Sequence, residues 1–251
     1  MAGVDGRVAL VTGAGRGIGR ATAELLAARG ARVMGVARSR AELEALCLEY
    51  FVADLGTAEG CAQAVAETEA RLGPIEILVC NHGIGSAHEK LIWEQSPDTW
   101  KETMRINLDG PFELSRRVMR GMTERGYGRV VFTSSTAGLV AEHAGSAYNS
   151  SKHGLIGLMR SVATDGGAFG VTSNAVLPGW VRTEMAERSA RQEAKDRGVS
   201  PDQVWEERAA MYPPGRVATA QEVAEAIAFL ASEESSGISG EAIRVALGST
   251  E

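Results

Sequence analysis

Several protein classes are excluded by what the sequence does not contain. No run of 18 or more apolar residues occurs among the 251 residues, so no membrane-spanning helix is expected. The opening residues, MAGVDGRVALVTG, lack the charged and apolar regions of a secretory signal. The three cysteines, Cys47, Cys61 and Cys80, show no metal-ligand spacing. We therefore expect a cytoplasmic protein with buried thiols and without a bound metal.

An excess of positive charge is also absent. The chain has 26 Lys and Arg residues against 32 Asp and Glu residues, which gives a formal net charge of −6. No basic field is available to hold nucleic acid or an anionic membrane, so we expect neither partner. The length and a hydrophobic content of 44% fit one α/β domain that covers residues 1–251.

Short apolar runs alternate with longer Ala-rich stretches along the whole chain. Runs such as VALV, ILVC and VVF are apolar at every position, so a strand formed by them presents apolar side chains to both faces of its sheet. This is typical of strands buried on both faces of a parallel sheet. We expect strands at Val8–Val11, Arg32–Val36, Tyr50–Ala53, Ile75–Cys80, Arg129–Thr133, Thr172–Val176 and Ala242–Ala246. Helices are expected near residues 17–29, 40–48, 57–72, 97–125, 147–168 and 219–232. The pattern predicts a doubly wound α/β fold of Rossmann type, with a mostly parallel seven-stranded sheet and helices on both faces.

One long segment, residues 180–216, interrupts this alternation. It mixes tryptophans and methionines with many charges, and we interpret it as one or two amphipathic helices that cover a substrate pocket. A plain surface excursion is the alternative.

A glycine-rich string, Thr12-Gly13-Ala14-Gly15-Arg16-Gly17-Ile18-Gly19, joins the first strand to the first helix. At a strand–helix junction such glycines let the backbone approach a pyrophosphate, and the helix N-terminus offers unpaired N–H groups. The end of the second strand carries no acidic residue before Glu42 that could accept a ribose 2′-hydroxyl. Arg38 and Arg16 could instead pair with a 2′-phosphate, so NADP(H) is favoured over NAD(H).

Tyr148 and Lys152 stand four residues apart on the helix expected after the fifth strand, so their side chains project from one face. A free phenol has a pKa near 10, and a neighbouring ammonium group favours its ionised form. The pair is therefore suited to proton transfer. Thr133-Ser134-Ser135 ends the preceding strand, where a hydroxyl can bind the carbonyl oxygen being reduced.

Together these motifs resemble the short-chain dehydrogenase/reductase family, in its single-domain, NADP-preferring, ketoreductase-like branch. The resemblance covers nearly the whole sequence and rests on TGAGRGIG at 12–19, Ala53-Asp54-Leu55, the NHG element at 81–83, Asn107 in INLDGPF, Ser135 in TSSTAG, Tyr148 with Lys152, and Pro178–Thr183.

The resemblance implies a role for each motif. Its catalytic residues are Asn107, Ser135, Tyr148 and Lys152, where Asn107 bends its helix and supports a water-mediated proton path. Its cofactor-binding residues are Gly13, Gly15, Arg16, Gly17, Ile18, Gly19, Arg38, Asp54, Leu55, Asn81, Gly83, Tyr148, Lys152, Pro178, Gly179, Val181 and Thr183. A homotetramer or homodimer, with the tetramer built on the helices near 97–125 and 147–168, is typical of the family.

The sequence departs from the family pattern at three places. His82 stands where the family's NNAG element has Ala, and we favour a tolerated substitution over a role in tuning the cofactor fit. The helix between the second and third strands is shorter than usual, and the chain ends EAIRVALGSTE where relatives commonly have VDGG. The remaining histidines, His88, His143 and His153, have solvated or turn roles by default.

We expect a small-molecule substrate that contacts Val140, His143, Trp180 and Met185. The leading hypothesis is an NADP(H)-dependent oxidoreductase that interconverts a ketone and a secondary alcohol, with Tyr148 as general acid/base. An NAD-dependent alcohol or polyol dehydrogenase of the same fold is the alternative among enzymes. A nucleotide-binding scaffold without catalysis is disfavoured because the Ser, Tyr and Lys of the site are all present.

Overall fold

The computed structural model describes residues 3–86 and 90–249, so His88 lies outside the described residues. Its seven strands form one sheet in the order β3-β2-β1-β4-β5-β6-β7. The strands are β1 Val8–Thr12, β2 Arg32–Ala37, β3 Glu49–Val52, β4 Ile77–Cys80, β5 Gly128–Thr133, β6 Val171–Pro178 and β7 Ala242–Val245. Every pair of neighbouring strands is parallel, which confirms the predicted doubly wound sheet and replaces "mostly parallel" by wholly parallel.

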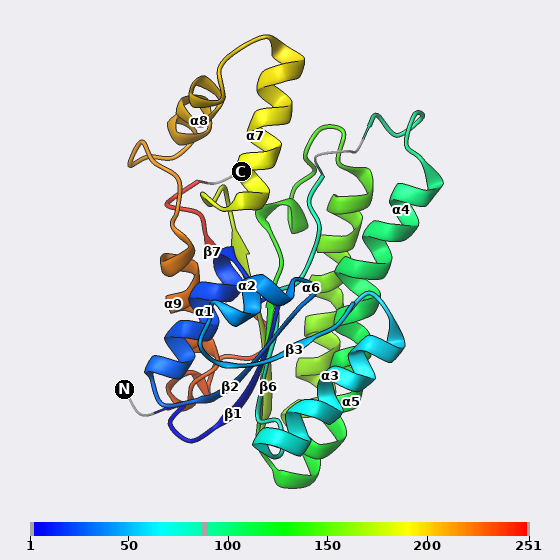
Figure 1. The fold of residues 1–251 in the computed structure, drawn as a ribbon, viewed down its shortest axis with the longest axis vertical. Coiled ribbons are helices and arrows are strands. Elements are labelled where there is room, and N and C mark those ends of the chain that lie inside the picture. The colour runs from blue at the N-terminus through cyan, green and yellow to red at the C-terminus, as the bar shows by residue number, and fades with distance from the viewer. Residues whose placement is uncertain (1–2, 87–89, 250–251) are drawn as a thin grey trace.

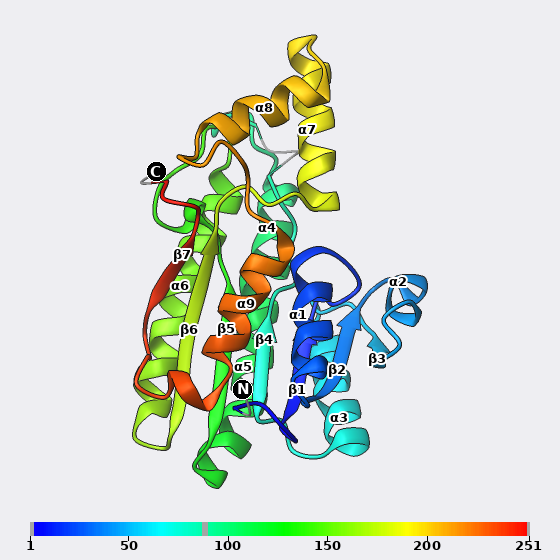
Figure 2. The ribbon, with the colours of Figure 1, turned by 90° about the vertical axis from the view of Figure 1, so that its left-hand side faces the viewer.

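Helices cover both faces of the sheet (Figures 1 and 2). They are α1 Gly17–Ala28, α2 Arg40–Glu44, α3 Ala58–Leu72, α4 Pro97–Met104, α5 Gly110–Arg125, α6 Ser146–Gly167, α7 Glu184–Arg197, α8 Pro201–Ala210 and α9 Ala220–Leu230. Alternate residues of a strand enter different cores: Leu10 packs with α5 and α6, while Val11 packs with α1 and α9. The runs that are apolar at both alternations therefore fill two cores, one on each face. Among the described residues, no helix is long and apolar enough to cross a membrane.

Two predicted helices differ from the observed ones in ways that affect the site. The helix expected over 97–125 is divided by a π-helical turn, η1 Arg105–Asp109, between α4 and α5. The helix expected over 40–48 ends at Glu44. Cys47, which is exposed and not buried as expected, adopts a left-handed conformation with φ of 53°. Because a non-glycine residue in that conformation cannot continue a right-handed helix, the chain turns early into β3.

Residues 180–216 contain two helices, α7 and α8, which stand beyond one end of the sheet (Figure 1). Thr183 and Ser200 cap their N-termini, and Gly198 ends α7 in the left-handed conformation. The two helices have a small core of their own, in which Ala190 and Ala194 pack with Trp205. We refer to α7, α8 and their connection as the α7–α8 hairpin.

Candidate active site

The carboxyl ends of the parallel strands gather residues from distant parts of the sequence at one edge of the sheet. The strand order reverses direction between β1 and β4, and in open α/β sheets ligands bind at such a switch point. The segments that follow β1, β4, β5 and β6 are the glycine loop, the NHG element, the Thr-Ser-Ser turn and the segment from Pro178 to Thr183. The sequence-predicted motifs therefore gather at one end of the sheet, where a ligand-binding crevice is expected.

The glycine loop has the shape of a cradle for a phosphate. Gly13 and Gly17 have φ of 65° and 55°, a conformation that L side chains rarely adopt. An ideal Cβ on Gly19 would lie 2.2 Å from the carbonyl oxygen of Gly13, so only glycine fits there. Within the described part of the chain, no side chain caps the N-terminus of α1, whose first residue is Gly17. Its backbone N–H groups thus remain available to an anion.

Thr12 connects the glycine loop to the end of β4. Its Oγ1 donates to the carbonyl oxygen of Val79 at 3.0 Å and accepts from the Asn81 N–H at 2.9 Å. The Asn81 amide in turn donates to the carbonyl oxygen of Thr12 at 3.2 Å. Thr12 belonged to the predicted string but received no role from the sequence. Its hydroxyl fixes the spacing of the two strand ends that border the crevice.

His82 points its imidazole into the protein, away from solvent. Its Nδ1 lies 2.8 Å from Thr12 Oγ1, and its buried Nε2 has no hydrogen-bond partner among the described residues. Burial lowers the pKa of His82 from 6.5 to about 3, so the ring is neutral. An ideal Cβ on Gly110 would lie 2.8 Å from Nε2, so Gly110 provides the space for the ring. The sequence signal for Gly110 was the bulky residue at 82, which requires a small neighbour.

Lys152 lies beneath the Tyr148 ring. Its Nζ is 5.6 Å from the centroid of that ring and donates to the carbonyl oxygen of Thr133 at 2.9 Å. The Lys152 side chain is buried, and this desolvation lowers its pKa from 10.5 to about 8. An ideal Cβ on Gly83 would lie 3.8 Å from Nζ, so the NHG element also borders the ammonium group. The structure thus brings together the predicted Tyr–Lys pair.

Ser135 and Asn107, the other two predicted catalytic residues, are each held by hydrogen bonds. Ser135 caps a short 3₁₀ helix, with its Oγ accepting from the Ala137 N–H at 3.1 Å. Asn107 lies in the π-helical turn η1, which agrees with the predicted irregularity of its helix. Its Oδ1 accepts from the Ile84 N–H at 2.8 Å, and its Nδ2 donates to the Ile84 carbonyl at 2.9 Å and to Ser151 Oγ at 3.1 Å. These three bonds fix Asn107 between the end of β4 and α6.

The residues predicted for the adenosine end have different partners. Arg38 is exposed, and within the described residues it has no hydrogen bond or ion pair. Burial alone would raise the pKa of Asp54, but the Gly56 N–H and the Arg105 guanidinium hold this pKa below its usual value. Leu55 is buried beside this turn.

Arg16 forms ion pairs with Glu42 at 3.0 Å and Glu184 at 3.2 Å. Neither carboxylate was predicted from the sequence as a partner of Arg16, because both are far from Arg16 along the chain.

The segment after β6 approaches the glycine loop. An ideal Cβ on Gly17 would lie 3.2 Å from Thr183 Cγ2, so Thr183 borders the start of α1. Val181 is buried, and Tyr212 Oη accepts from the Trp180 N–H at 2.6 Å. An ideal Cβ on Gly179 would lie 2.4 Å from that oxygen. Tyr212, which follows the α7–α8 hairpin, thus braces this segment, and no motif in the sequence indicated this contact.

The four predicted substrate residues have two kinds of surroundings. Val140, His143 and Met185 are exposed, and Met185 Sδ would lie 3.3 Å from an ideal Cβ on Gly85. Trp180 instead packs in the α7–α8 hairpin, where the Arg208 guanidinium lies 3.6 Å from its ring centroid. Its ring is therefore engaged by the hairpin itself.

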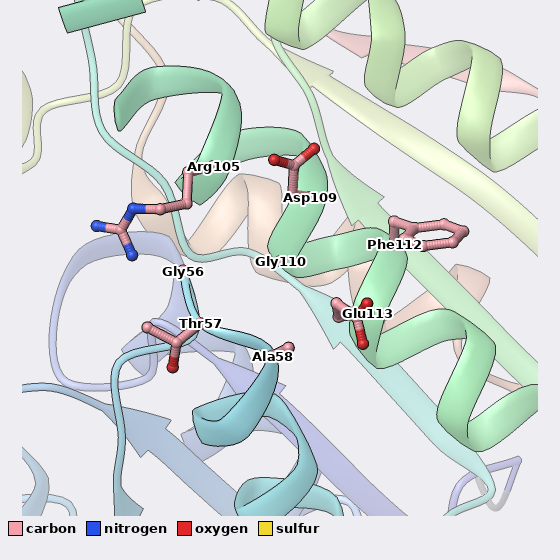
Figure 3. A pocket seen from close by; sticks show the side chains of 8 residues that line it. All are labelled: Gly56, Thr57, Ala58, Arg105, Asp109, Gly110, Phe112 and Glu113. Carbon is pink, nitrogen blue, oxygen red and sulfur yellow. The ribbon is translucent and has the colours of Figure 1, made fainter. Parts of the chain in front are cut away.

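A separate pocket of about 350 Å³ opens between the turn after β3 and the start of α5 (Figure 3). Gly56 and Thr57 line one wall, and Arg105, Asp109 and Phe112 line the other. Arg105 also pairs with Asp54, so the pocket lies beside the turn that carries Asp54. Among the described residues, no group of three His, Cys, Asp or Glu side chains could hold a metal ion.

The fold and the site together define a Rossmann-type oxidoreductase, and comparisons with known proteins identify its family. The family model described as enoyl-(acyl carrier protein) reductase matches residues 13–250. The chain is 37% identical to 3-oxoacyl-(acyl-carrier-protein) reductase FabG of Escherichia coli (strain K12), and the match covers 96% of each chain. It is 35% identical to acetoacetyl-CoA reductase of Rhizobium meliloti (strain 1021), over 94% of this chain and 95% of the relative.

Among solved structures, the chain is similar to a variant of actinorhodin polyketide ketoreductase with NADPH. The TM-score is 0.93 at 32% sequence identity, and the match covers 99% of this chain and 98% of the other. The chain therefore belongs to the short-chain dehydrogenase/reductase family, whose members are NAD(P)-dependent oxidoreductases of CH–OH and C=O groups.

Proposed function

We propose that this protein interconverts a ketone and a secondary alcohol with NADP(H), with Tyr148 as its general acid/base. The observation that carries the proposal is the buried Lys152 ammonium group, 5.6 Å from the centroid of the Tyr148 ring and at the carboxyl ends of β4 and β5. A positive charge at this place favours the phenolate form that proton transfer requires.

Each of the proposed catalytic residues has a separate role in carbonyl reduction. A bound nicotinamide would supply the hydride for the carbonyl carbon, and Tyr148 gives its phenolic proton to the carbonyl oxygen. Ser135 orients that oxygen through its hydroxyl group. The proton lost by Tyr148 is replaced from solvent along a path bordered by Lys152 and Asn107. In the reverse direction the same phenolate accepts the proton of the alcohol.

The nucleotide fits the crevice because the glycine loop leaves a cradle that side chains would fill. We assign the pyrophosphate to the loop from Gly13 to Gly19, including Gly15 and Ile18, and to the N-terminus of α1. The adenosine is assigned to Arg38, Asp54, Leu55, Asn81 and Gly83. The nicotinamide is assigned to Pro178, Gly179, Val181 and Thr183, with Tyr148 and Lys152 at its ribose.

Three observations support NADP(H) over NAD(H). β2 contains no acidic residue, and Arg38 follows it with an exposed side chain free of partners within the described part of the chain. A guanidinium group pairs well with a phosphate. A similar ketoreductase has been solved with NADPH.

The α7–α8 hairpin stands beside this crevice, and we propose that it covers the bound substrate.

The test replaces the phenolic hydroxyl while keeping the ring. Tyr148→Phe should lower kcat for reduction of acetoacetyl-CoA or a cyclic ketone by at least about a hundredfold, since proton transfer contributes about 10²–10⁴. Nucleotide affinity, measured by titration, should stay within about twofold because the ring remains. Tyr50→Phe, on the edge strand β3, where the hydroxyl contacts Arg40 and Glu44, is the matched control with unchanged turnover. A Tyr148→Phe protein with substantial activity would show that another group is the acid.

A further inference from the structure

A carboxylate lies where the adenosine ribose is expected, although β2 itself carries none. An ideal Cβ on Gly15 would lie 2.7 Å from Glu42 Oε2, 2.9 Å from Glu42 Cβ and 3.6 Å from Ala37 Cβ. Glu42 therefore covers Gly15 of the glycine loop and lies next to the carboxyl end of β2. In Rossmann folds this is where an acidic residue binds a ribose 2′-hydroxyl.

The short helix α2 holds Glu42 in this place. Leu43 and Leu46 are buried in the core beneath it, which fixes how the helix sits on the sheet. Ser39 caps the helix, and the Ser39–Glu42 spacing matches a capping box. At the same spacing in α9, Glu222 closes the box by accepting from the Thr219 N–H at 2.8 Å. The described hydrogen bonds contain no such return bond for Glu42, whose carboxylate is turned towards the glycine loop instead.

The two carboxylate oxygens of Glu42 have different surroundings. Oε1 accepts from Arg16 Nη1 at 3.0 Å, and the same nitrogen donates to Glu184 Oε2 at 3.2 Å. Oε2 lies over Gly15 and has no hydrogen-bond partner within residues 3–86 and 90–249. Of the two arginines suited to a 2′-phosphate, Arg16 is thus engaged by two carboxylates, while Arg38 is uncommitted. Near the carboxyl end of β2, the Arg38 guanidinium and the Glu42 Oε2 atom are thus both without a hydrogen bond or ion pair among the described residues.

We propose that Glu42 is a specificity-determining residue that opposes Arg38. Its Oε2 accepts a hydrogen bond from the ribose 2′-hydroxyl of NAD(H), and its charge repels the 2′-phosphate of NADP(H). The preference between the two nucleotides therefore depends on two opposing interactions, the repulsion of the 2′-phosphate by Glu42 and its attraction by Arg38. The wild-type protein binds NADP(H) only a little more tightly than NAD(H). This inference rests on the proposed function because it concerns the same nucleotide site.

The test is to remove the charge of Glu42 and measure nucleotide affinity without any substrate. For Glu42→Gln, calorimetric titration at one fixed ionic strength should give an NADPH affinity raised about tenfold, because a repulsive charge is removed and Arg16 is released. The NADH affinity should fall a few-fold, since an amide oxygen is a weaker acceptor than a carboxylate. Titration with 2′,5′-ADP and 5′-ADP should show the same change in ratio, because these compounds contain only the adenosine end.

Two control variants separate the causes. Glu44 lies on the same helix and pairs with Tyr50 and Arg40, away from Gly15. The Glu44→Gln variant should therefore leave the NADPH/NADH affinity ratio within about twofold of wild type. Glu184→Gln releases Arg16 from the α7–α8 hairpin but leaves the carboxylate beside Gly15, so the ratio should change by less than about threefold.

Each other outcome overturns a defined part of the reasoning. If Glu42→Gln leaves both affinities within twofold of wild type, Glu42 does not set the preference. If Glu184→Gln raises the ratio as much as Glu42→Gln, release of Arg16 is the cause and the role of Oε2 is wrong. Failure of the wild-type protein to bind either nucleotide would overturn the proposed function as well, whereas binding with an unchanged ratio overturns this inference alone.

Discussion

The buried imidazole of His82 predicts how the stability of the protein depends on pH. Its pKa is lowered from 6.5 to about 3 by burial, so the folded protein keeps the ring neutral at pH values where the unfolded chain protonates it. Protonation of the unfolded state favours unfolding. The contribution of His82 to stability is therefore complete above pH 6.5 and is lost as the pH falls from 6.5 towards 3.

The size of the effect follows from the distance between the pH and the ordinary pKa. pH 5 is about 1.5 units below the ordinary value, and each unit corresponds to 1.36 kcal/mol. The free energy of unfolding should therefore fall by about 2 kcal/mol between pH 7 and pH 5 because of this one group. Carboxylates change protonation in the same range, so the wild-type protein alone does not isolate the effect.

The assay compares wild type with His82→Ala by urea unfolding, followed by tryptophan fluorescence, at pH 7 and pH 5 and at one protein concentration. His82→Ala should lose about 2 kcal/mol less than wild type between the two pH values. Any cavity left by the imidazole affects both pH values equally and cancels from this difference. His143→Ala, at an exposed position, should behave like wild type. An equal loss in wild type and His82→Ala would show that His82 is protonated in the folded protein.

Two further predictions concern Gly110 and Lys152. Gly110→Ala should lower the free energy of unfolding by about 2 kcal/mol in the same assay, because its Cβ would lie 2.3 Å from the Leu55 carbonyl and 2.8 Å from His82 Nε2. A loss below about 0.5 kcal/mol would show that the π-helical turn can shift. The pKa of Lys152, lowered from 10.5 to about 8 by burial, lets the folded protein release a proton that the unfolded chain keeps, so stability rises between these pH values. Wild type should gain about 1 kcal/mol relative to Lys152→Met between pH 8 and pH 9, and parallel curves would contradict the lowered pKa.

The sheet and the main motifs could be predicted because they depend on local sequence. Strands buried on both faces must be apolar at both alternations, and parallel strands bring their carboxyl ends to one edge. The glycine loop, the NHG element and the Tyr148–Lys152 pair each follow a strand or lie in the next helix. Their meeting at the crevice therefore follows once the strand order is known.

The contacts that were missed join residues with no fixed spacing in the sequence. Glu42 contacts Gly15 from the short helix α2, which stops at Glu44. The left-handed Cys47 that follows cannot be predicted from residue types, since cysteine has no preference for that conformation. Tyr212 reaches Trp180 across the whole α7–α8 hairpin. Such contacts depend on where packing places a backbone, to within about an ångström, and not on periodicity.

Trp180 shows why an aromatic residue beside an active site is a weak sign of substrate contact. The Arg208 guanidinium lies between the Trp180 and Trp205 rings, 3.6 Å and 5.1 Å from their centroids. Arg208 is buried and also donates to the Ala186 carbonyl and to Glu193, so its charge is compensated inside the hairpin. A hairpin whose own core contains mainly alanines has little apolar surface to hold its helices together. The two tryptophans and the arginine supply the missing contacts. The need to pack the two helices together therefore accounts for the tryptophans of the segment without reference to a substrate.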